Sequence, residues 1–383
     1  MKITRRGFVG SIGLGTAAGI LSNSNIFSRG AQAATEGSGS APKVYDGGIM
    51  QLTQNESARG PGPKTIQALH DHISKRLGRG YAPDHVDDLR IALAQRHAVA
   101  NEAIVLATGS GPLLQAGVRA FCTADKALVT VGPTYTTCEQ TAREIGAGLK
   151  VIRVNDAMAL DLDAMAAAAI GAGMVYLCNP NNPTGTVHSA VAIESFVRQV
   201  MRDSPATRIM IDEAYIDYVD PSVMQSAKLL AFEFANVFIT RSFSKAHGMA
   251  GLRVGYAIGQ EQTLKALNSA WNLGDINMLA AIAAITSLND TQHIVEEREE
   301  NTSIRQFTVA AFHDMGFEVA ESYVNHIFVN LRRPASEFRA ACLQHSIAVG
   351  RDFPPMENTH CRISLGSREE MLTAVEVFRK VLA

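Results

Sequence analysis

The stretch Val237-Phe238-Ile239-Thr240-Arg241-Ser242-Phe243-Ser244-Lys245 ends in a lysine that follows a short apolar run. The apolar residues predict a buried strand. Lysine is strongly hydrated and rarely lies beside a core without a specific reason. One such reason is covalent chemistry, because a partly desolvated amine forms a Schiff base with a carbonyl compound. A surface lysine at the start of a helix is the alternative interpretation, and the Ser-x-Ser-Lys pattern taken alone favours that alternative.

Groups that bind phosphate lie close to this lysine. Ser242 and Ser244 precede it, and Arg253 follows eight residues later. Hydroxyls supply hydrogen-bond donors and arginine supplies a fixed cation, and together they bind phosphate. An amine suited to a Schiff base beside a phosphate-binding set indicates pyridoxal 5'-phosphate (PLP) as the cofactor.

Strands and helices alternate between residues 103 and 259, which predicts an α/β fold with a mainly parallel, doubly wound sheet. Strand-like runs occupy 103–109, 126–131, 149–154, 173–178 and 208–211, and helical patterns occupy 112–122, 137–145 and 190–202. In such sheets, ligands bind at the carboxyl ends of the strands. The unusual residues gather at these ends, so we expect one shared site that includes Ser110, Gly111, Tyr135, Asn182, Asp212, Ser244 and Lys245.

The pattern changes after about Trp271. Helical patterns at 278–288, 294–312, 336–345 and 368–382 alternate with strand-like segments at 318–319, 327–331, 347–350 and 361–365. This mixture predicts a smaller α+β domain at the C-terminus. We therefore expect a large PLP-binding domain at 61–270 and a small domain at 271–383. A Gly/Ser-rich linker or arm at 35–60 precedes them.

Residues 1–34 have the three-part layout of a secretory signal peptide. Arg5-Arg6 opens the segment, a weakly apolar run at 7–21 follows, and Ala31-Gln32-Ala33 has the small residues of a cleavage site. The arginine pair followed by Gly7-Phe8-Val9 is similar to twin-arginine (Tat) signals, which predicts export to the periplasm. A cytoplasmic protein whose N-terminal tail contains a chance arginine pair is the alternative.

Composition narrows the classes of function. The 383 residues, 46 % of them hydrophobic, are enough for two domains and a large core. The net charge of −2 gives no electrostatic basis for binding nucleic acid, or a membrane apart from export. Five cysteines are scattered without C-x-x-C spacing, so we expect no zinc site and no disulfide framework. A single bridge is the alternative in an exported protein, and the sequence does not select its pair.

A PLP site needs further parts, and each candidate has an ordinary structural alternative. The ring nitrogen needs a carboxylate, for which Asp212 is placed, although Asp212 also suits a helix cap. Asn182 and Tyr215 are suited to hydrogen-bond the phenolic oxygen, and Asn182 equally suits a turn. Tyr135 is placed to stack on the ring, or else it is a core tyrosine. Ser110 opens a helix whose backbone N–H groups bind phosphate.

Three motifs together resemble fold-type I, PLP-dependent class I and II aminotransferases, most of all the histidinol-phosphate aminotransferase branch. They are Asn179-Pro180-Asn181-Asn182-Pro183-Thr184-Gly185, Asp212-Glu213-Ala214-Tyr215 and residues 242–256. The resemblance extends from about Tyr45 to the C-terminus. It implies that Lys245 forms the Schiff base and shuttles the α-proton, and that Asp212 pairs with the pyridine nitrogen. It further implies contacts to the phenolate oxygen by Asn182 and Tyr215, stacking by Tyr135, and phosphate binding by Ser110, Gly111, Ser242, Ser244 and Arg253. Family members are usually dimers, and Tyr81 matches a tyrosine that reaches the phosphate from the partner subunit.

The residues expected to bind substrate are Arg362, Arg351, Arg59 and Asn182. Arg362 matches the family arginine for the α-carboxylate, and Arg351 matches a second substrate-binding arginine of the branch or is an exposed loop residue. The family's Asn-Glu-Asn-Pro-Tyr-Gly appears here as Asn55-Glu56-Ser57-Ala58-Arg59-Gly60, so Arg59 replaces a tyrosine that recognises substrate phosphate. Arg59 either binds another anionic group or faces solvent. The replacement and the predicted export both argue against histidinol phosphate as the substrate.

The sequence therefore predicts PLP-dependent transamination between an L-amino acid and a 2-oxo acid by a homodimer, through a Schiff base on Lys245. Other PLP chemistry on the same scaffold is the alternative: decarboxylation, a lyase reaction or O₂-dependent oxidation. A PLP- or amino-acid-binding protein without turnover is a further alternative, although binding alone does not need the carboxylate of Asp212. His247 either tunes proton transfer or packs in the core.

Overall fold

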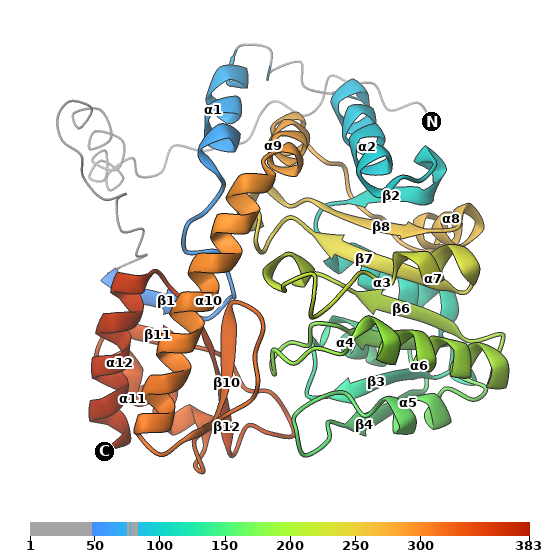
Figure 1. The fold of residues 1–383 in the computed structure, drawn as a ribbon. Helices are drawn as coiled ribbons and strands as arrows, with labels where there is room; N and C mark the ends of the chain where they lie inside the picture. Colours follow the sequence, from blue (N-terminus) through green and yellow to red (C-terminus); the bar gives the residue numbers. More distant parts are fainter. Residues whose placement is uncertain (1–47, 75–76, 78–82) are drawn as a thin grey trace, which may run out of the picture. The chain divides into compact units, whose positions relative to one another are not determined.

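The computed structural model describes residues 48–74, 77 and 83–383, which belong to a compact unit spanning 45–383 (Figure 1). The predicted signal peptide at 1–34, residues 35–47 of the predicted linker, and Tyr81 lie outside the described residues. The described part of the chain contains a seven-stranded, a three-stranded and a two-stranded sheet. The predicted α/β architecture is confirmed, with a large mainly parallel sheet followed by a smaller α+β region.

The large sheet has the strand order β2-β8-β7-β6-β5-β3-β4. Its strands are β2 (Ile104–Ala107), β3 (Leu128–Gly132), β4 (Leu149–Arg153), β5 (Met174–Cys178), β6 (Arg208–Asp212), β7 (Val237–Ser242) and β8 (Gly255–Gly259). β8 is antiparallel to both of its neighbours, and the other paired strands are parallel. The carboxyl ends of β3, β5, β6 and β7 therefore lie along one edge, where α/β proteins bind their ligands.

Helices cover both faces of this sheet because its strands are apolar on both sides. They are α2 (Pro83–His97), α3 (Gly111–Phe121), α4 (Thr137–Glu144), α5 (Leu162–Ala168), α6 (Ala190–Asp203), α7 (Lys228–Glu233), α8 (Glu261–Ala270) and α9 (Met278–Asn289). Alternate residues of β5 enter different cores: Val175 and Leu177 pack with α6 and α9, whereas Met174 and Tyr176 pack with α3 and α8. This alternation makes the sheet doubly wound, as predicted.

The C-terminal region has a separate core. Its elements are α10 (Thr291–Asp314), β9 (Glu318–Val319), β10 (His326–Asn330), α11 (Ala335–Gln344), β11 (Ile347–Val349), β12 (His360–Ser364) and α12 (Arg368–Leu382). The antiparallel sheet β12-β10-β9 packs its apolar face on these helices through Phe312, Ile327, Phe338 and Phe378.

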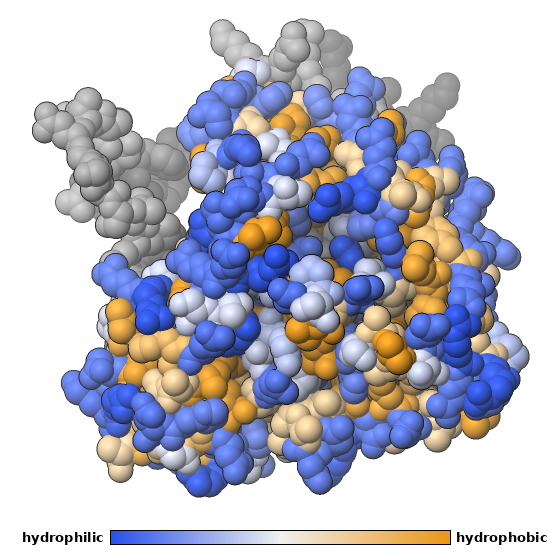
Figure 2. Space-filling view, viewed as in Figure 1, coloured by the Kyte–Doolittle hydropathy of each residue, from blue (hydrophilic) through white to orange (hydrophobic). Residues whose placement is uncertain are grey.

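Hydrophilic residues predominate on the face of the molecule shown in Figure 2, and hydrophobic residues are interspersed among them, as on an ordinary protein surface.

An N-terminal arm joins the two regions. Strand β1 (Met50–Leu52) pairs in parallel with β11, and helix α1 (Pro63–His72) packs against α9 of the large region. Short 3-10 turns occur at Asn101–Ala103, Ile216–Tyr218 and Ala250–Leu252. No helix in the described ranges has both the length and the apolar composition that a membrane span requires.

Candidate active site

A cavity of about 570 Å³ opens at the carboxyl edge of the large sheet. Its lining comes from the segments after β2, β3, β5, β6 and β7, from the C-terminal region and from the arm. Twelve residues singled out in the sequence line it: Ser110, Gly111, Tyr135, Asn182, Asp212, Tyr215, Ser242, Ser244, Lys245, Arg253, Arg351 and Arg362. The structure therefore brings together residues that are dispersed over 250 positions of the chain.

Lys245 lies three residues beyond the end of β7 and is partly buried. Its Nζ donates hydrogen bonds to the main-chain oxygens of Gln54 (3.1 Å) and Asn55 (3.2 Å), and it lies 5.4 Å from the centre of the Tyr215 ring. Burial, followed by the positive charge of Arg362, lowers the pKa of Lys245 to about 8. An amine with this pKa is partly deprotonated near neutral pH, which is the form that attacks a carbonyl carbon.

Asp212 is the last residue of β6, and its buried carboxylate lines the cavity. Tyr176 donates to Oδ2 at 3.0 Å, and Thr240 donates to Oδ1 at 3.0 Å. Burial raises the pKa of Asp212 to about 6, against the opposing effect of these hydrogen bonds. No cation of the described chain forms an ion pair with this carboxylate. A cationic ring nitrogen of a ligand would supply the missing partner.

An anion cradle lies around the first turn of α3. Ser110, Gly111, Ser242 and Ser244 line the cavity there, and Arg253 Nη1 lies 3.4 Å from Ser244 Oγ. Gly109 has φ +86°, and a Cβ at that position would lie 2.2 Å from Arg253 Nη2. Glycine at this position thus lets the guanidinium approach the helix start. Backbone N–H groups, hydroxyls and a guanidinium together suit a phosphate group.

The opposite wall carries Arg362 and Arg351. Arg362, from β12, is buried and donates to Asn182 Oδ1 at 2.9 Å and to the main-chain oxygen of Thr53. Burial lowers the pKa of Arg362 to about 10. Arg351 follows β11, donates to Thr136 Oγ1 at 3.3 Å and is exposed. The guanidinium carbons of Arg351 and Arg362 lie 4.3 and 4.9 Å from the centre of the Phe353 ring, so one aromatic ring seats both cations.

The structure corrects the expectation for Arg59. This residue does not line the cavity. Its guanidinium lies 3.4 Å from Glu296, 3.9 Å from Glu297 and 3.4 Å from Glu300, all on α10. Three carboxylates already neutralise this cation, so Arg59 fastens the arm to α10 outside the cavity.

His247 belongs to the core. Its Nδ1 lies 2.7 Å from Ser287 Oγ, its Nε2 lies 3.6 Å from Asp217 Oδ2, and its ring packs on Phe243 at 4.6 Å between centroids. The packing interpretation of this histidine is therefore the correct one.

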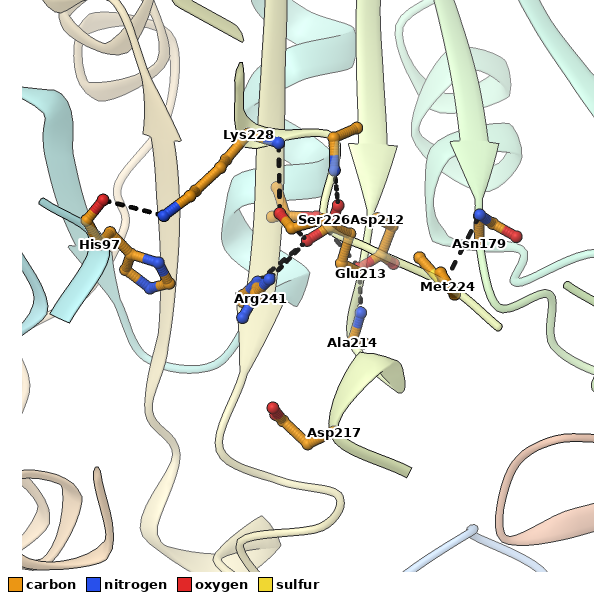
Figure 3. A network of polar contacts seen from close by, with 12 residues as sticks. His97, Asn179, Asp212, Glu213, Ala214, Asp217, Met224, Ser226, Lys228 and Arg241 are labelled. Atoms are coloured by element: carbon orange, nitrogen blue, oxygen red, sulfur yellow. Dashed lines mark hydrogen bonds and ion pairs between the residues drawn. The ribbon is translucent and has the colours of Figure 1, made fainter. Parts of the chain in front are cut away.

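A polar network lies behind the site (Figure 3). Glu213, directly after Asp212, is fully buried and accepts hydrogen bonds from Arg241 Nε (3.0 Å) and Nη2 (2.8 Å). Ser226 Oγ and the main-chain N–H of Ala227 donate to the same carboxylate at 2.8 and 2.7 Å. This ion pair ties the end of β6 to β7 and so fixes the spacing between Asp212 and the strand that leads to Lys245.

Sequence reasoning missed three residues that hold the site: Asn55, Tyr176 and Thr240. Asn55 Nδ2 donates to the Tyr215 hydroxyl at 2.9 Å, while Tyr176 and Thr240 hydrogen-bond Asp212. Period-2 alternation places Tyr176 on the same face as Cys178, which was the available signal for its orientation. Asn55 opens the Asn55–Gly60 motif, which was the available signal, but the motif does not reveal its contacts because the Tyr215 hydroxyl lies 160 residues away.

The residues of the cavity fit PLP group by group. Lys245 suits the aldehyde, the unpaired buried carboxylate of Asp212 suits a protonated ring nitrogen, and the cradle with Arg253 suits the phosphate. Tyr135 is 36 % exposed at the cavity wall, where an aromatic ring has room to stack on it. Among the described residues no cluster of His, Cys, Asp or Glu is arranged to hold a metal ion.

Comparisons with known proteins agree with this geometry. The family model described as aminotransferase class I and II matches residues 47–378. A histidinol-phosphate aminotransferase of Moorella thermoacetica is 32% identical over 338 residues, 88% of this chain and 86% of that protein. One from Limosilactobacillus fermentum is 31% identical, covering 84% of this chain and 88% of that protein.

A solved structure extends the comparison to the fold. The histidinol-phosphate aminotransferase from Sinorhizobium meliloti, in complex with pyridoxal-5'-phosphate, has a TM-score of 0.79 and 26% identity, covering 87% of this chain and 91% of that one. The predicted fold-type I PLP transferase architecture is therefore confirmed.

Proposed function

The chain belongs to the class I and II aminotransferases and is a PLP-dependent aminotransferase, and from this premise we propose that its preferred amino acid and 2-oxo acid each carry a second acidic group. When bound, PLP supplies an aldehyde that carries the amino group and a ring that withdraws electrons. The proposal concerns what the residues of this chain contribute to that chemistry.

Each residue role follows from its place in the cavity. Lys245, whose pKa is lowered to about 8, would bind the aldehyde covalently. Once the amino group of the substrate displaced the lysine from that carbon, the freed Nζ would be the base that moves the proton at the substrate's α-carbon. Asp212 would keep the ring nitrogen protonated, and the hydroxyls of Tyr176 and Thr240 hold Asp212 in place. Asn182 and Tyr215 orient the ring, and Ser110, Gly111, Ser242, Ser244 and Arg253 hold the phosphate.

The observation that carries the substrate proposal is the pair of guanidinium groups on Phe353. Arg362 is buried, and its contact with Asn182 places it beside the cofactor residues, so it binds the α-carboxylate. Arg351 lies on the same ring and is exposed, whereas Arg362 is buried, so Arg351 binds an anion at the far end of the substrate. Two cations at one wall favour a substrate with two acidic groups, such as glutamate or aspartate and their 2-oxo acids.

A panel of single half-reactions tests this preference. Holoenzyme is mixed with one amino acid at a time, and the loss of the cofactor absorbance is recorded. We expect glutamate or aspartate to have the highest kcat/KM. Arg351→Ala should raise KM for these substrates by roughly 10- to 100-fold, because it removes a charge-assisted hydrogen bond, and should leave KM for alanine nearly unchanged. A preference for neutral amino acids, or an equal effect of Arg351→Ala on both classes, would contradict the proposal.

Histidinol phosphate is the second candidate, because the curated relatives carry it in their names. It belongs in the same panel. Arg59 stands where the branch has its phosphate-recognising tyrosine, and Arg59 is neutralised by three glutamates of α10 outside the cavity. We therefore expect histidinol phosphate to react more slowly than the dicarboxylic amino acids.

Export by a twin-arginine signal and assembly as a homodimer complete the proposal. The layout of residues 1–34 supports export, and N-terminal sequencing of periplasmic material should begin near Ala34. Retention of the whole protein in the cytoplasm with Met1 intact would contradict export.

The family resemblance supports a dimer in which Tyr81 reaches the partner's phosphate site. Light scattering should give twice the chain mass, and Tyr81→Phe should weaken cofactor binding.

A further inference from the structure

Asn55 occupies an unusual position in the arm. It is fully buried and adopts a left-handed backbone conformation, with φ 54°. Asparagine tolerates this region better than most residues, because its short polar side chain bonds locally. The residue is held by contacts with two distant parts of the chain: the turn after β6 and the C-terminal sheet.

Both ends of the side-chain amide of Asn55 are occupied by hydrogen-bonding partners. Ser364 Oγ, on β12, donates to Oδ1 at 2.6 Å, and the same oxygen of Ser364 accepts the main-chain N–H of Asn55 at 2.9 Å. Nδ2 donates to the Tyr215 hydroxyl at 2.9 Å and lies 2.9 Å from His326 Nδ1, on β10. An amide with both ends occupied has one orientation, and its N–H groups point at Tyr215 and His326.

The polarity of this chain of hydrogen bonds follows from His326. Burial, followed by the nearby charges of Arg362 and Lys245, lowers the pKa of His326 well below its usual value, so the ring stays neutral. Its Nδ1 is then free to accept from Asn55. The Tyr215 oxygen likewise accepts from Asn55, which leaves the proton of the hydroxyl to be donated into the cavity that Tyr215 lines.

The main chain of Asn55 reaches the reactive lysine. Its carbonyl oxygen accepts from Lys245 Nζ at 3.2 Å and from Asn325 Nδ2 at 2.9 Å. Asn325 also donates to the carbonyl of Glu56 at 3.2 Å, so the C-terminal region holds the arm against the lysine. One residue thus contacts both Tyr215 and Lys245 while being fastened to β10 and β12.

We propose that Asn55 is a positioning residue of the transamination site, which sets the direction in which the Tyr215 hydroxyl donates and the place where the Lys245 amine rests. The proposal rests on the cofactor chemistry described above and is independent of which amino acid is the substrate. If Asn55 has this role, the arm contributes directly to the geometry of the transamination site.

The test measures the pH midpoint of the visible absorbance change of substrate-free holoenzyme, which reports proton loss from the bond between Lys245 and the cofactor. Donation by Tyr215 stabilises a negative oxygen in the cavity and so favours proton loss. In Asn55→Asp, the new carboxylate accepts the Tyr215 proton and turns it away from the cavity. We expect the midpoint to rise by about one pH unit, a tenfold change in the proton equilibrium, and kcat to fall by roughly tenfold with KM little changed.

Two comparisons separate positioning from a merely structural role. Asn301→Asp changes a buried asparagine on α10 whose Nδ2 donates to the Val324 carbonyl and which does not touch Tyr215 or Lys245, so the midpoint should stay constant. In the Tyr215→Phe background, Asn55→Asp should shift the midpoint much less than in the parent. The charged groups that act on Lys245 are Arg362, Glu56, Arg253 and Asp212, and all four are kept in every variant. Asn55→Asp adds one carboxylate near Lys245, whose field alone raises the midpoint. That contribution is present with or without the Tyr215 hydroxyl, so the Tyr215→Phe background measures it and the difference between the two shifts reports the hydroxyl.

An unchanged midpoint in Asn55→Asp, or an equal shift in the Tyr215→Phe background, would overturn the proposal. If Asn55→Asp does not fold, Ser364→Ala decides the question, because it removes both the donor to Asn55 Oδ1 and the acceptor of the Asn55 main-chain N–H without adding a charge. A smaller upward shift in that variant supports the proposal, and a folded Ser364→Ala enzyme with the parent midpoint contradicts it. The measurement uses no substrate, so its outcome is separate from that of the substrate panel.

Discussion

At the scale of single residues, the site depends on two buried groups that do not neutralise each other. The amine of Lys245 donates hydrogen bonds to main-chain carbonyls of the arm, and the carboxylate of Asp212 accepts hydrogen bonds from the hydroxyls of Tyr176 and Thr240. Burial lowers the pKa of the lysine to about 8 and raises that of the aspartate to about 6. Both values therefore move toward the pH range in which the enzyme works, as is typical of catalytic groups.

Asp212→Asn should separate stability from function. The folded pKa of Asp212, about 6, exceeds the ordinary value of 3.8, so the folded protein binds this proton more tightly than the unfolded chain. Stability of the cofactor-free protein therefore falls as pH rises from about 4 to 6 and stays lower above that range. Asp212→Asn has no buried charge to desolvate, so at pH 8 its free energy of unfolding should exceed that of the parent by on the order of 2 kcal/mol.

Urea unfolding of cofactor-free protein at pH 5 and pH 8 checks this expectation. The advantage of Asp212→Asn should be larger at pH 8, while transaminase activity of the loaded variant should fall by about a thousandfold, because the ring-nitrogen proton loses its carboxylate. A variant that is less stable than the parent at both pH values, by the same amount, would show that the carboxylate is not strained in the free protein.

The residues that could be predicted from the sequence are those at strand ends. Lys245, Asp212 and Asn182 each follow an apolar run, and the topology of parallel strands brings such ends together. Asn55 could not be predicted, because its role depends on contacts with Tyr215 and Ser364, 160 and 309 residues away. The ion pairs of Arg59 could not be predicted for the same reason: the three glutamates that hold it lie on α10, more than 230 residues later.

At the scale of elements, the spacing of β6 and β7 is the critical feature. Asp212 ends β6, and β7 leads to Lys245, so any shift between the two strands moves one group relative to the other. The buried pair of Glu213 and Arg241 joins the strands at this point (Figure 3). Removing one partner leaves an uncompensated buried charge, whereas removing both does not.

A double-mutant cycle on this pair follows from that argument. Glu213→Gln and Arg241→Met should each lower the free energy of unfolding by roughly 3 kcal/mol, and the double variant should lose clearly less than the sum. Guanidinium chloride unfolding of the four proteins measures the coupling. Additive losses would mean that the two side chains act independently and that the pair does not set the strand spacing.

The loop after Lys245 offers a matched pair of glycine substitutions. Gly248 has φ +67°, and a Cβ there would lie 2.1 Å from the main chain of Gly60 in the arm, whereas a Cβ on Gly251 meets nothing within 4 Å. Gly248→Ala should therefore push the arm away and destabilise the protein by more than about 1 kcal/mol, and Gly251→Ala should be tolerated. Thermal unfolding compares them, and equal Tm values for the two variants would contradict the close packing of the arm.

Element positions were predictable where the pattern was long. The helices predicted at 190–202 and 368–382 form as α6 and α12 with nearly the same bounds. Strand β8 was not predicted, because glycine at both ends leaves only three larger residues, and α5 was missed in an alanine-rich segment without clear periodicity. Strand β1 has three residues and forms only because β11, almost 300 residues later, provides its hydrogen-bonding partner.

At the scale of the whole molecule, the arm links the two cores to one cavity. Strand β1 belongs to the C-terminal core, α1 packs against α9 of the large region, and the residues between them line the cavity (Figure 1). Both cores therefore contribute to the position of Lys245, through Gln54 and Asn55 on one side and through β7 on the other. This explains why residues from nearly the whole described chain meet at one lysine.

The most direct test of the central claim is to identify the residue that binds the cofactor. Holoenzyme is reduced with borohydride and digested, and the modified peptide is identified by mass spectrometry. The account predicts that the cofactor is fixed to Lys245, that borohydride abolishes the visible absorbance band, and that Lys245→Ala has neither the band nor transaminase activity. Modification of a different lysine, or a Lys245→Ala enzyme with full activity, would contradict it.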